Sequence, residues 1–180
     1  MTDQQANSSP EQSNGAAQIS PLPVHIHAQY IKDFSLESPN APQSLGKQDG
    51  EPALNVDLSM DANKIDDFEG AKNTYEVTLS VSAHAKRADK TLFIAELQYG
   101  MAVSVGDIPS DQIHPLLLIE MPHYLFPYVR QIIGEATQRA GFMPLMLSPV
   151  NFAALYQSRF GQQGQTPDNI DAAGKEKETA

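Results

Sequence analysis

Apolar and polar residues alternate with a period of two in four segments of the first half of the chain. This pattern is typical of strands with one buried face. The segments are residues 26–37, 54–61, 75–83 and 91–105. Four such strands in succession predict an antiparallel meander with one packed face and one wet face. The packed face is predicted to contain Ile26, Ala28, Tyr30, Phe34, Leu36, Leu54, Val56, Leu58, Met60, Tyr75, Val77, Leu79, Val81, Phe93, Ala95, Leu97, Tyr99, Met101, Val103 and Val105.

The wet face of the predicted sheet is acidic. Asp33 and Glu37 share it on the first strand, and Glu96 lies on it in the last. Ile31 and Ile94 are predicted to be its apolar exceptions. An acidic face commonly serves only solubility, but an apolar residue among carboxylates also fits a binding patch for a basic partner. Both interpretations stay open on the residues alone.

The period changes to that of a helix in the second half of the chain. A helix is predicted to begin near residue 122 and to end before Gly141, which is a plausible C-cap. Ser148 and Pro149 predict the start of a short last helix. The fold class is therefore α+β, with a four-stranded antiparallel sheet packed against a long helix and a short C-terminal helix. The two apolar stripes are Leu125, Phe126, Val129, Ile132, Ile133, Ala136 and Ala140, then Phe152, Leu155, Tyr156 and Phe160.

The segment FMPLMLSPVNFAALY, residues 142–156, is unusually apolar for a connection. Pro144 and Pro149 prevent a continuous helix through it. Part of the segment can fold back into the core. An interrupted segment cannot bury every neighbour, however, and Met143 and Met146 are flexible side chains suited to varied apolar guests. A groove for extended peptide or a subunit interface accounts for the excess.

Composition narrows the class of protein further. The chain has 180 residues, with 12 basic against 22 acidic side chains and a net charge of −10. This charge argues against binding to nucleic acid, which needs clustered Lys and Arg. There is no cysteine, so disulfides, zinc–thiolate sites and a thiol nucleophile are excluded.

Polar, low-hydrophobicity segments predict two disordered tails, residues 1–23 and 161–180, around one domain at residues 24–160. The first residues lack the basic start and the apolar run of a signal peptide. No window approaches the roughly 20 apolar residues of a membrane span, so we expect no membrane insertion. The expected location is the cytoplasm.

Candidate catalytic or metal-binding groups are sparse. His25 and His27 would point the same way on a strand, but no third ligand is evident nearby. His114, Glu120 and His123 could form a His–Glu pair, yet nothing near them suggests a nucleophile or an oxyanion donor. The chain also lacks a glycine-rich phosphate loop and a Gly-x-Ser-x-Gly elbow. We expect no enzyme activity and no cofactor.

Three motifs resemble the SecB protein-export chaperones of Gram-negative bacteria. They are YIKDFSLESPNAP at 30–42, LFPYVRQII at 125–133 and LSPVNFAALY at 147–156, and the similarity runs in order from about residue 26 to 160. The resemblance implies a cytoplasmic homotetramer, a dimer of dimers, without ATP or enzyme activity. Such a chaperone holds unfolded secretory precursors in apolar grooves and delivers them to the translocation ATPase SecA.

The resemblance also implies which residues bind. SecA's small, basic, zinc-bearing C-terminal domain would dock on the acidic face at Asp33, Glu37, Ile94 and Glu96. The family's frequent tryptophan after the first strand is missing, because this chain has no tryptophan. A SecB-like chaperone of a toxin–antitoxin pair and a carrier of a small apolar ligand remain as alternatives. Unfolded peptide would bind at Phe93, Leu145, Leu147, Val150, Phe152 and Tyr156.

Overall fold

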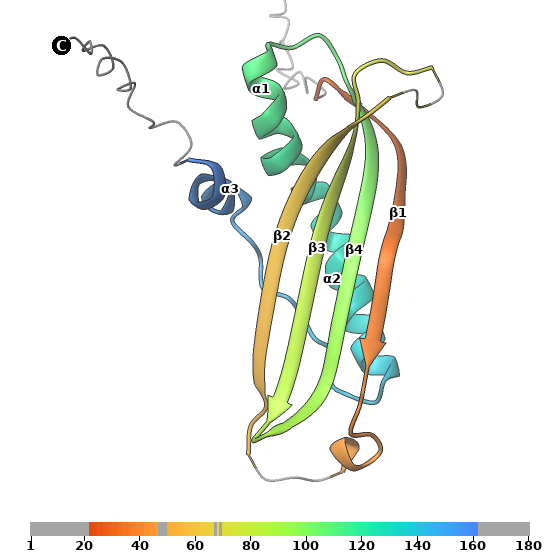
Figure 1. Cartoon of the computed structure of the whole chain (residues 1–180), viewed down its shortest axis with the longest axis vertical. Coiled ribbons are helices and arrows are strands. Elements are labelled where there is room, and N and C mark those ends of the chain that lie inside the picture. The colour runs from red at the N-terminus through yellow and green to blue at the C-terminus, as the bar shows by residue number, and fades with distance from the viewer. Residues whose placement is uncertain (1–21, 47–49, 67, 69, 162–180) are drawn as a thin grey trace, which may run out of the picture.

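The computed structural model describes residues 22–46, 50–66, 68 and 70–161, so the two predicted tails lie almost wholly outside the described residues. A twisted antiparallel sheet carries the helices on one face (Figure 1). This arrangement confirms the predicted α+β class. The strands are β1 (Val24–Glu37), β2 (Ala53–Ile65), β3 (Thr74–Arg87) and β4 (Lys90–Val105). The helices are η1 (Gln43–Leu45), α1 (Ser110–Pro115), the π-helical η2 (Leu116–Glu120), α2 (Met121–Arg139) and α3 (Phe152–Phe160).

The strand order is β1-β4-β3-β2, which corrects the predicted meander of all four strands. Only β2, β3 and β4 form a meander; β1 pairs with β4 rather than β2. The difference follows from connection length. Arg87 pairs with Lys90 across a two-residue turn, so β3 and β4 must be neighbours. β1 ends at Glu37 and β2 begins at Ala53, so the connection between them is long enough for β4 and β3 to lie between these two strands.

Two irregularities in β1 shift its alternation. The register with β4 skips His27 and then Lys32, so residues 28–31 face opposite ways from a regular strand. Partners on antiparallel strands share a face. Ile31 pairs with Tyr99, whose ring stacks on Tyr128 of α2, so Ile31 lies on the helix-bearing face. The prediction that Ile31 belongs to the acidic face was wrong, because period-two counting cannot detect bulges.

Tyr30 lies on the outer face, opposite to its predicted position in the core. Its hydroxyl donates a hydrogen bond to Glu76 of β3 at 2.5 Å, and its ring lies over Gly100. A Cβ at position 100 would meet Tyr30 Cε2 at 2.9 Å, closer than a side chain can approach. Gly100 therefore leaves the room that the ring occupies on the sheet.

The core forms between β3, β4 and α2. Val77, Leu79 and Met101 from the sheet and Leu125 and Ile133 from α2 are all fully buried, as the two periodicities predict. A continuous helical run precedes α2 from Ser110 onward, which the prediction of a start near residue 122 did not include. The end of α2 agrees with the prediction, since Gly141 has φ +90°.

The last helix begins at Phe152 rather than next to Pro149, so the predicted cap at Ser148 was wrong. Asn151 is the N-cap, and its side chain accepts a hydrogen bond from the Ala154 amide at 2.9 Å. Asn satisfies the free amides of a first turn as well as Ser does. Residues 143–151 consequently stay extended for longer than predicted, and they form one wall of the site described next.

Candidate functional site

The segment from Gly141 to Asn151, here called the apolar loop, crosses the helix-bearing face of the sheet between α2 and β2 (Figure 1). Three hollows of about 540, 430 and 310 Å³ adjoin it, and Met146 lines all three. Together they form what we call the loop cleft. Its apolar walls include Leu54, Val56, Leu58, Phe93, Phe126, Phe142, Met143, Pro144, Leu145, Met146, Leu147 and Val150.

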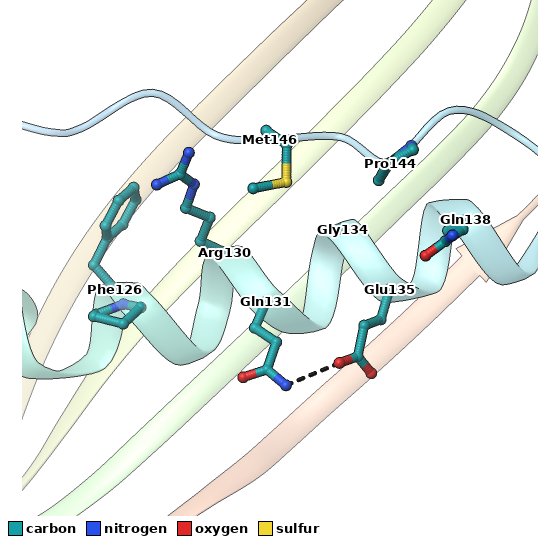
Figure 2. A pocket seen from close by; sticks show the side chains of 9 residues that line it. Phe126, Arg130, Gln131, Gly134, Glu135, Gln138, Pro144 and Met146 are labelled. Atoms are coloured by element: carbon teal, nitrogen blue, oxygen red, sulfur yellow. Dashed lines mark hydrogen bonds between the residues drawn. The ribbon is translucent and has the colours of Figure 1, made fainter.

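The apolar loop is attached to α2 through Thr137. The Thr137 hydroxyl accepts the Leu145 amide at 2.9 Å and donates to the carbonyls of Ile133 and Gly134. Leu145 O and Met146 Sδ lie 3.5 Å from the position that a Cβ would take at Gly134, so the apolar loop packs closely on α2 at this point. Figure 2 shows Met146 and Pro144 over this stretch of α2. The backbone of an otherwise irregular segment is thus held against a rigid helix.

The six residues predicted to bind peptide occupy two different environments. Phe93, Leu145, Leu147 and Val150 line the loop cleft, whereas Phe152 and Tyr156 line none of its three hollows. Leu147 and Phe152 are only 5% and 1% exposed, so they belong to the core. These two residues therefore hold the cleft in position and contribute little to its accessible surface.

Phe152 connects α3 to α2, and Tyr156 connects it to α1. The Phe152 ring packs against His123 and Phe126 with ring centroids 4.9 and 6.0 Å apart. The Tyr156 hydroxyl forms a hydrogen bond of 2.7 Å with His114 Nδ1. Both aromatic residues therefore fix the end of the apolar loop in place.

The six residues predicted to bind peptide did not include the most exposed residues of the cleft. Met143 is 88% exposed and Met146 58% exposed, and Leu54 and Val56 of β2 are exposed as well. The two methionines carried a signal, since they stood out in the apolar loop. The β2 residues carried none, because alternation marks an apolar face without showing which part of that face a helix leaves bare.

The acidic residues predicted to bind SecA lie together on the outer face of the sheet. Glu37 pairs with Ile94, and Glu96 pairs with Ser35, so β1 and β4 present them side by side. Asp33 and Glu96 line a shallow hollow of about 250 Å³. Asp57 of β2 lines the same hollow and was not among the predicted binding residues. Small serine side chains of β2 and β3, those of Ser59, Ser80 and Ser82, contribute to the same hollow.

The carboxylates on the outer face of the sheet differ in whether a cation neutralises their charge. Lys32 Nζ lies 2.6 Å from Glu76 Oε2, and its hydrogen bond, with that of Tyr30, lowers the pKa of Glu76. Burial, and secondarily the Glu76 hydrogen bond, raises the pKa of Tyr30 to about 12. Within the described part of the chain no Lys or Arg pairs with the carboxylates of the hollow or with Glu37. The acidic face, defined as Asp33, Glu37, Asp57, Ile94 and Glu96, therefore keeps an unbalanced negative charge.

Three of the four candidate histidines, namely His27, His114 and His123, form hydrogen bonds within the chain. His27 Nε2 lies 2.5 Å from Ser104 Oγ, and His123 Nδ1 lies 2.7 Å from the Ile119 carbonyl. Across the described ranges no three His, Cys, Asp or Glu side chains are grouped as metal ligands, and no helix has the length and apolarity to cross a membrane.

An open apolar cleft on one face and an unbalanced acidic surface on the other are features of a protein that binds polypeptides. The comparisons with known proteins agree and are more specific. The family model "Preprotein translocase subunit SecB" matches residues 17–163. This chain belongs to the SecB family, and it is a protein-export chaperone of the SecB type.

Two relatives illustrate the likeness, both named "Protein-export protein SecB". The protein of Rhodopseudomonas palustris strain BisB5 is 42% identical over 159 residues, which is 88% of this chain and 94% of that protein. The protein of Bartonella quintana is 44% identical over 138 residues, 77% of this chain and 84% of that one.

A solved structure shares the fold. It is a SecB-like chaperone of Mycobacterium tuberculosis in complex with a peptide from the HigA1 antitoxin, with a TM-score of 0.52 and 15% identity over 71% of this chain and 90% of that one. At this identity the likeness concerns the fold alone.

Proposed function

We propose that this chain keeps secretory precursors unfolded by binding their apolar side chains in the loop cleft, without nucleotide. The observation that carries the proposal is Met146, an exposed apolar side chain that lines all three hollows of one open cleft. Each apolar side chain sheltered from water stabilises the complex by about 1.5–3 kcal/mol. A flexible thioether adapts to different guests, which suits a chaperone with many clients.

Delivery to SecA is the second part of the proposal. The acidic face presents carboxylates that no cation balances in the described residues, around the half-buried Ile94. A small basic domain such as that of SecA would be steered to this charge and would bury the isoleucine. The acidic face lies on the opposite side of the sheet from the loop cleft, so client and SecA can bind together.

The proposed assembly is a cytoplasmic homotetramer. Strand β1 is an edge of the sheet, and Ile26, Ile31 and Phe34 on its helix-bearing face are exposed. Tyr124 and Tyr128 of α2 are exposed too. A long edge with apolar side chains invites pairing with another copy. Several clefts on one oligomer would then hold one client by avidity.

Two substitutions on opposite faces test this function. Refolding of a chemically unfolded secretory precursor is followed without nucleotide, and binding of the SecA C-terminal domain is measured separately. We expect the wild-type protein to block refolding, Met146→Ser to weaken this block roughly tenfold and Ile94→Ser to leave it intact. Binding of the SecA domain should show the reverse pattern.

Each variant is the control for the other, because both replace an apolar side chain that is not fully buried. Refolding that proceeds unhindered at a large excess of the wild-type protein would reject the holdase role. Equal loss of both activities in both variants would instead indicate unfolding and would be visible in the circular dichroism spectrum.

A further inference from the structure

The methionines of the described chain fall into two groups. Met60, Met101 and Met121 are buried in the core, with 2%, 0% and 0% exposure. Met143 and Met146 are 88% and 58% exposed, and both line the loop cleft. The oxidisable sulfur atoms that water can reach are therefore concentrated where clients are proposed to bind.

We propose that Met143 and Met146 are a reversible oxidation site, and that their conversion to methionine sulfoxide by peroxide releases bound clients. This inference rests on the proposed function, because it names a modification of the same cleft. It adds a regulatory input, the oxidant level, to a site whose other apolar walls are hydrocarbon and aromatic groups without an oxidisable sulfur.

The reaction is a two-electron oxygen transfer. The thioether sulfur lone pair attacks one oxygen of hydrogen peroxide, the O–O bond breaks and an S–O bond forms. The departing hydroxide takes up the remaining peroxide proton and leaves as water. Sulfur is oxidised by two electrons and peroxide is reduced by two, with no other reactant. Methionine sulfoxide reductases reverse the change.

The structural consequence follows from the position of Met146. Its side chain lines the hollow beside α2, the hollow near Phe93 and the hollow along β2. One sulfoxide would make polar a side chain that belongs to the wall of all three. Apolar clients then lose contact area, and the sulfoxide oxygen loses water whenever a client covers it. Both effects weaken binding.

Exposure also makes the oxidation selective. Peroxide must reach the sulfur, and Met101 and Met121 lie in the packed core between the sheet and the helices. Low doses of peroxide should therefore modify the cleft and leave the core packed, so that clients are lost while the protein remains folded.

The test treats the full-length protein with increasing hydrogen peroxide, removes the peroxide with catalase and maps the added oxygen by peptide mass spectrometry. We expect Met143 and Met146 to react before the three core methionines. At full modification of these two, the protein concentration that halves the refolding rate of a secretory precursor should rise roughly tenfold. Treatment with methionine sulfoxide reductases should restore the original value.

The matched control is the double variant Met143→Leu with Met146→Leu, which keeps the apolar surface but cannot form a sulfoxide. Its holding is measured before and after peroxide and compared with its own untreated value, and we expect the treatment to leave that value unchanged. Unchanged holding by a wild-type protein oxidised at both positions would overturn the inference, and so would prior oxidation of the core methionines. An equal loss of precursor holding in the leucine variant after peroxide treatment would show that the oxidised residues responsible are not Met143 and Met146. Failure of untreated wild-type protein to hold any precursor would reject the proposed function itself, and this inference with it.

Discussion

Among single side chains, Glu76 shows how a carboxylate on a charged surface can be stabilised. Lys32 and Tyr30 each contact one of its two oxygens, at 2.6 and 2.5 Å. The Lys32 hydrogen bond is the largest cause of its lowered pKa. Its charge is thus balanced within the sheet, whereas no Lys or Arg of the described residues pairs with the carboxylates of the acidic face.

The lowered pKa of Glu76 predicts a pH-dependent contribution to stability. Since the folded state favours the ionised form, the contribution is complete well above the ordinary pKa of 4.5 and is lost as the pH falls through the lower folded value. Replacement Glu76→Gln should cost about 1 kcal/mol of unfolding free energy at pH 7, because the site is partly solvated. The difference from wild type should shrink below pH 4.5.

Urea unfolding at several pH values measures this difference. Glu135→Gln is the control, since its Arg139 neighbour is 3.7 Å away on an exposed surface of α2. A Glu76→Gln cost that stays constant down to acid pH would contradict the assignment.

The bulges at His27 and Lys32 show why such residue contacts could not be read from the sequence. In a strand without these two skipped residues, Tyr30 would point into the core and could not reach Glu76. A bulge depends on how two strands pair, so it has no local signal in one strand.

Among the secondary-structure elements, the apolar loop depends on one hydroxyl of α2. Thr137 is fully buried and is the only described side chain that hydrogen-bonds the Leu145 amide. Replacement Thr137→Val keeps the shape but leaves this amide without its acceptor, at a cost of about 1–3 kcal/mol. We expect faster hydrogen exchange at Leu145 and weaker holding of precursors.

The comparison is with Thr78→Val, a buried threonine on the outer face of the sheet. Hydrogen-exchange mass spectrometry of residues 141–151 should separate the two variants. If hydrogen exchange in residues 141–151 is equally slow in both variants, Thr137 does not position this segment.

The extent of α2 could be predicted from the sequence, but the strands that it covers could not. The stripe through Leu125, Val129 and Ile133 is buried as expected, because helical period and burial coincide on one packed face. The stripe does not indicate that α2 packs against β3 and β4. Nor does it indicate that Leu54 of β2 stays exposed. The cleft exists because a single helix is narrower than the sheet.

For the fold as a whole, the two proposed binding surfaces lie on opposite faces of one sheet, and a substitution of Asp57 tests the acidic one. Asp57 lines a hollow with Asp33 and Glu96, so Asp57→Asn should lower the affinity for the SecA C-terminal domain severalfold, mainly through slower association. The effect should fade at high salt because these carboxylates are exposed to solvent.

Binding kinetics at low and physiological salt measure this effect. Asp111→Asn, which removes an exposed acid from α1, matches the change in net charge and should have little effect. If both variants slow association equally, net charge rather than the acidic face governs the encounter.

The sequence by itself determined the strands, the long helix, the acidic composition and the family motifs, because periodicity and residue type are local properties. It also singled out the apolar loop and the residues of the acidic face other than Asp57. Only the tertiary structure decided the strand order, the side of the sheet on which Tyr30 and Ile31 lie, and which loop residues are exposed. These properties depend on pairing and coverage between distant segments. For that reason Leu147 and Phe152 became core while Met143 and Met146 became surface, although all four are apolar neighbours in the chain.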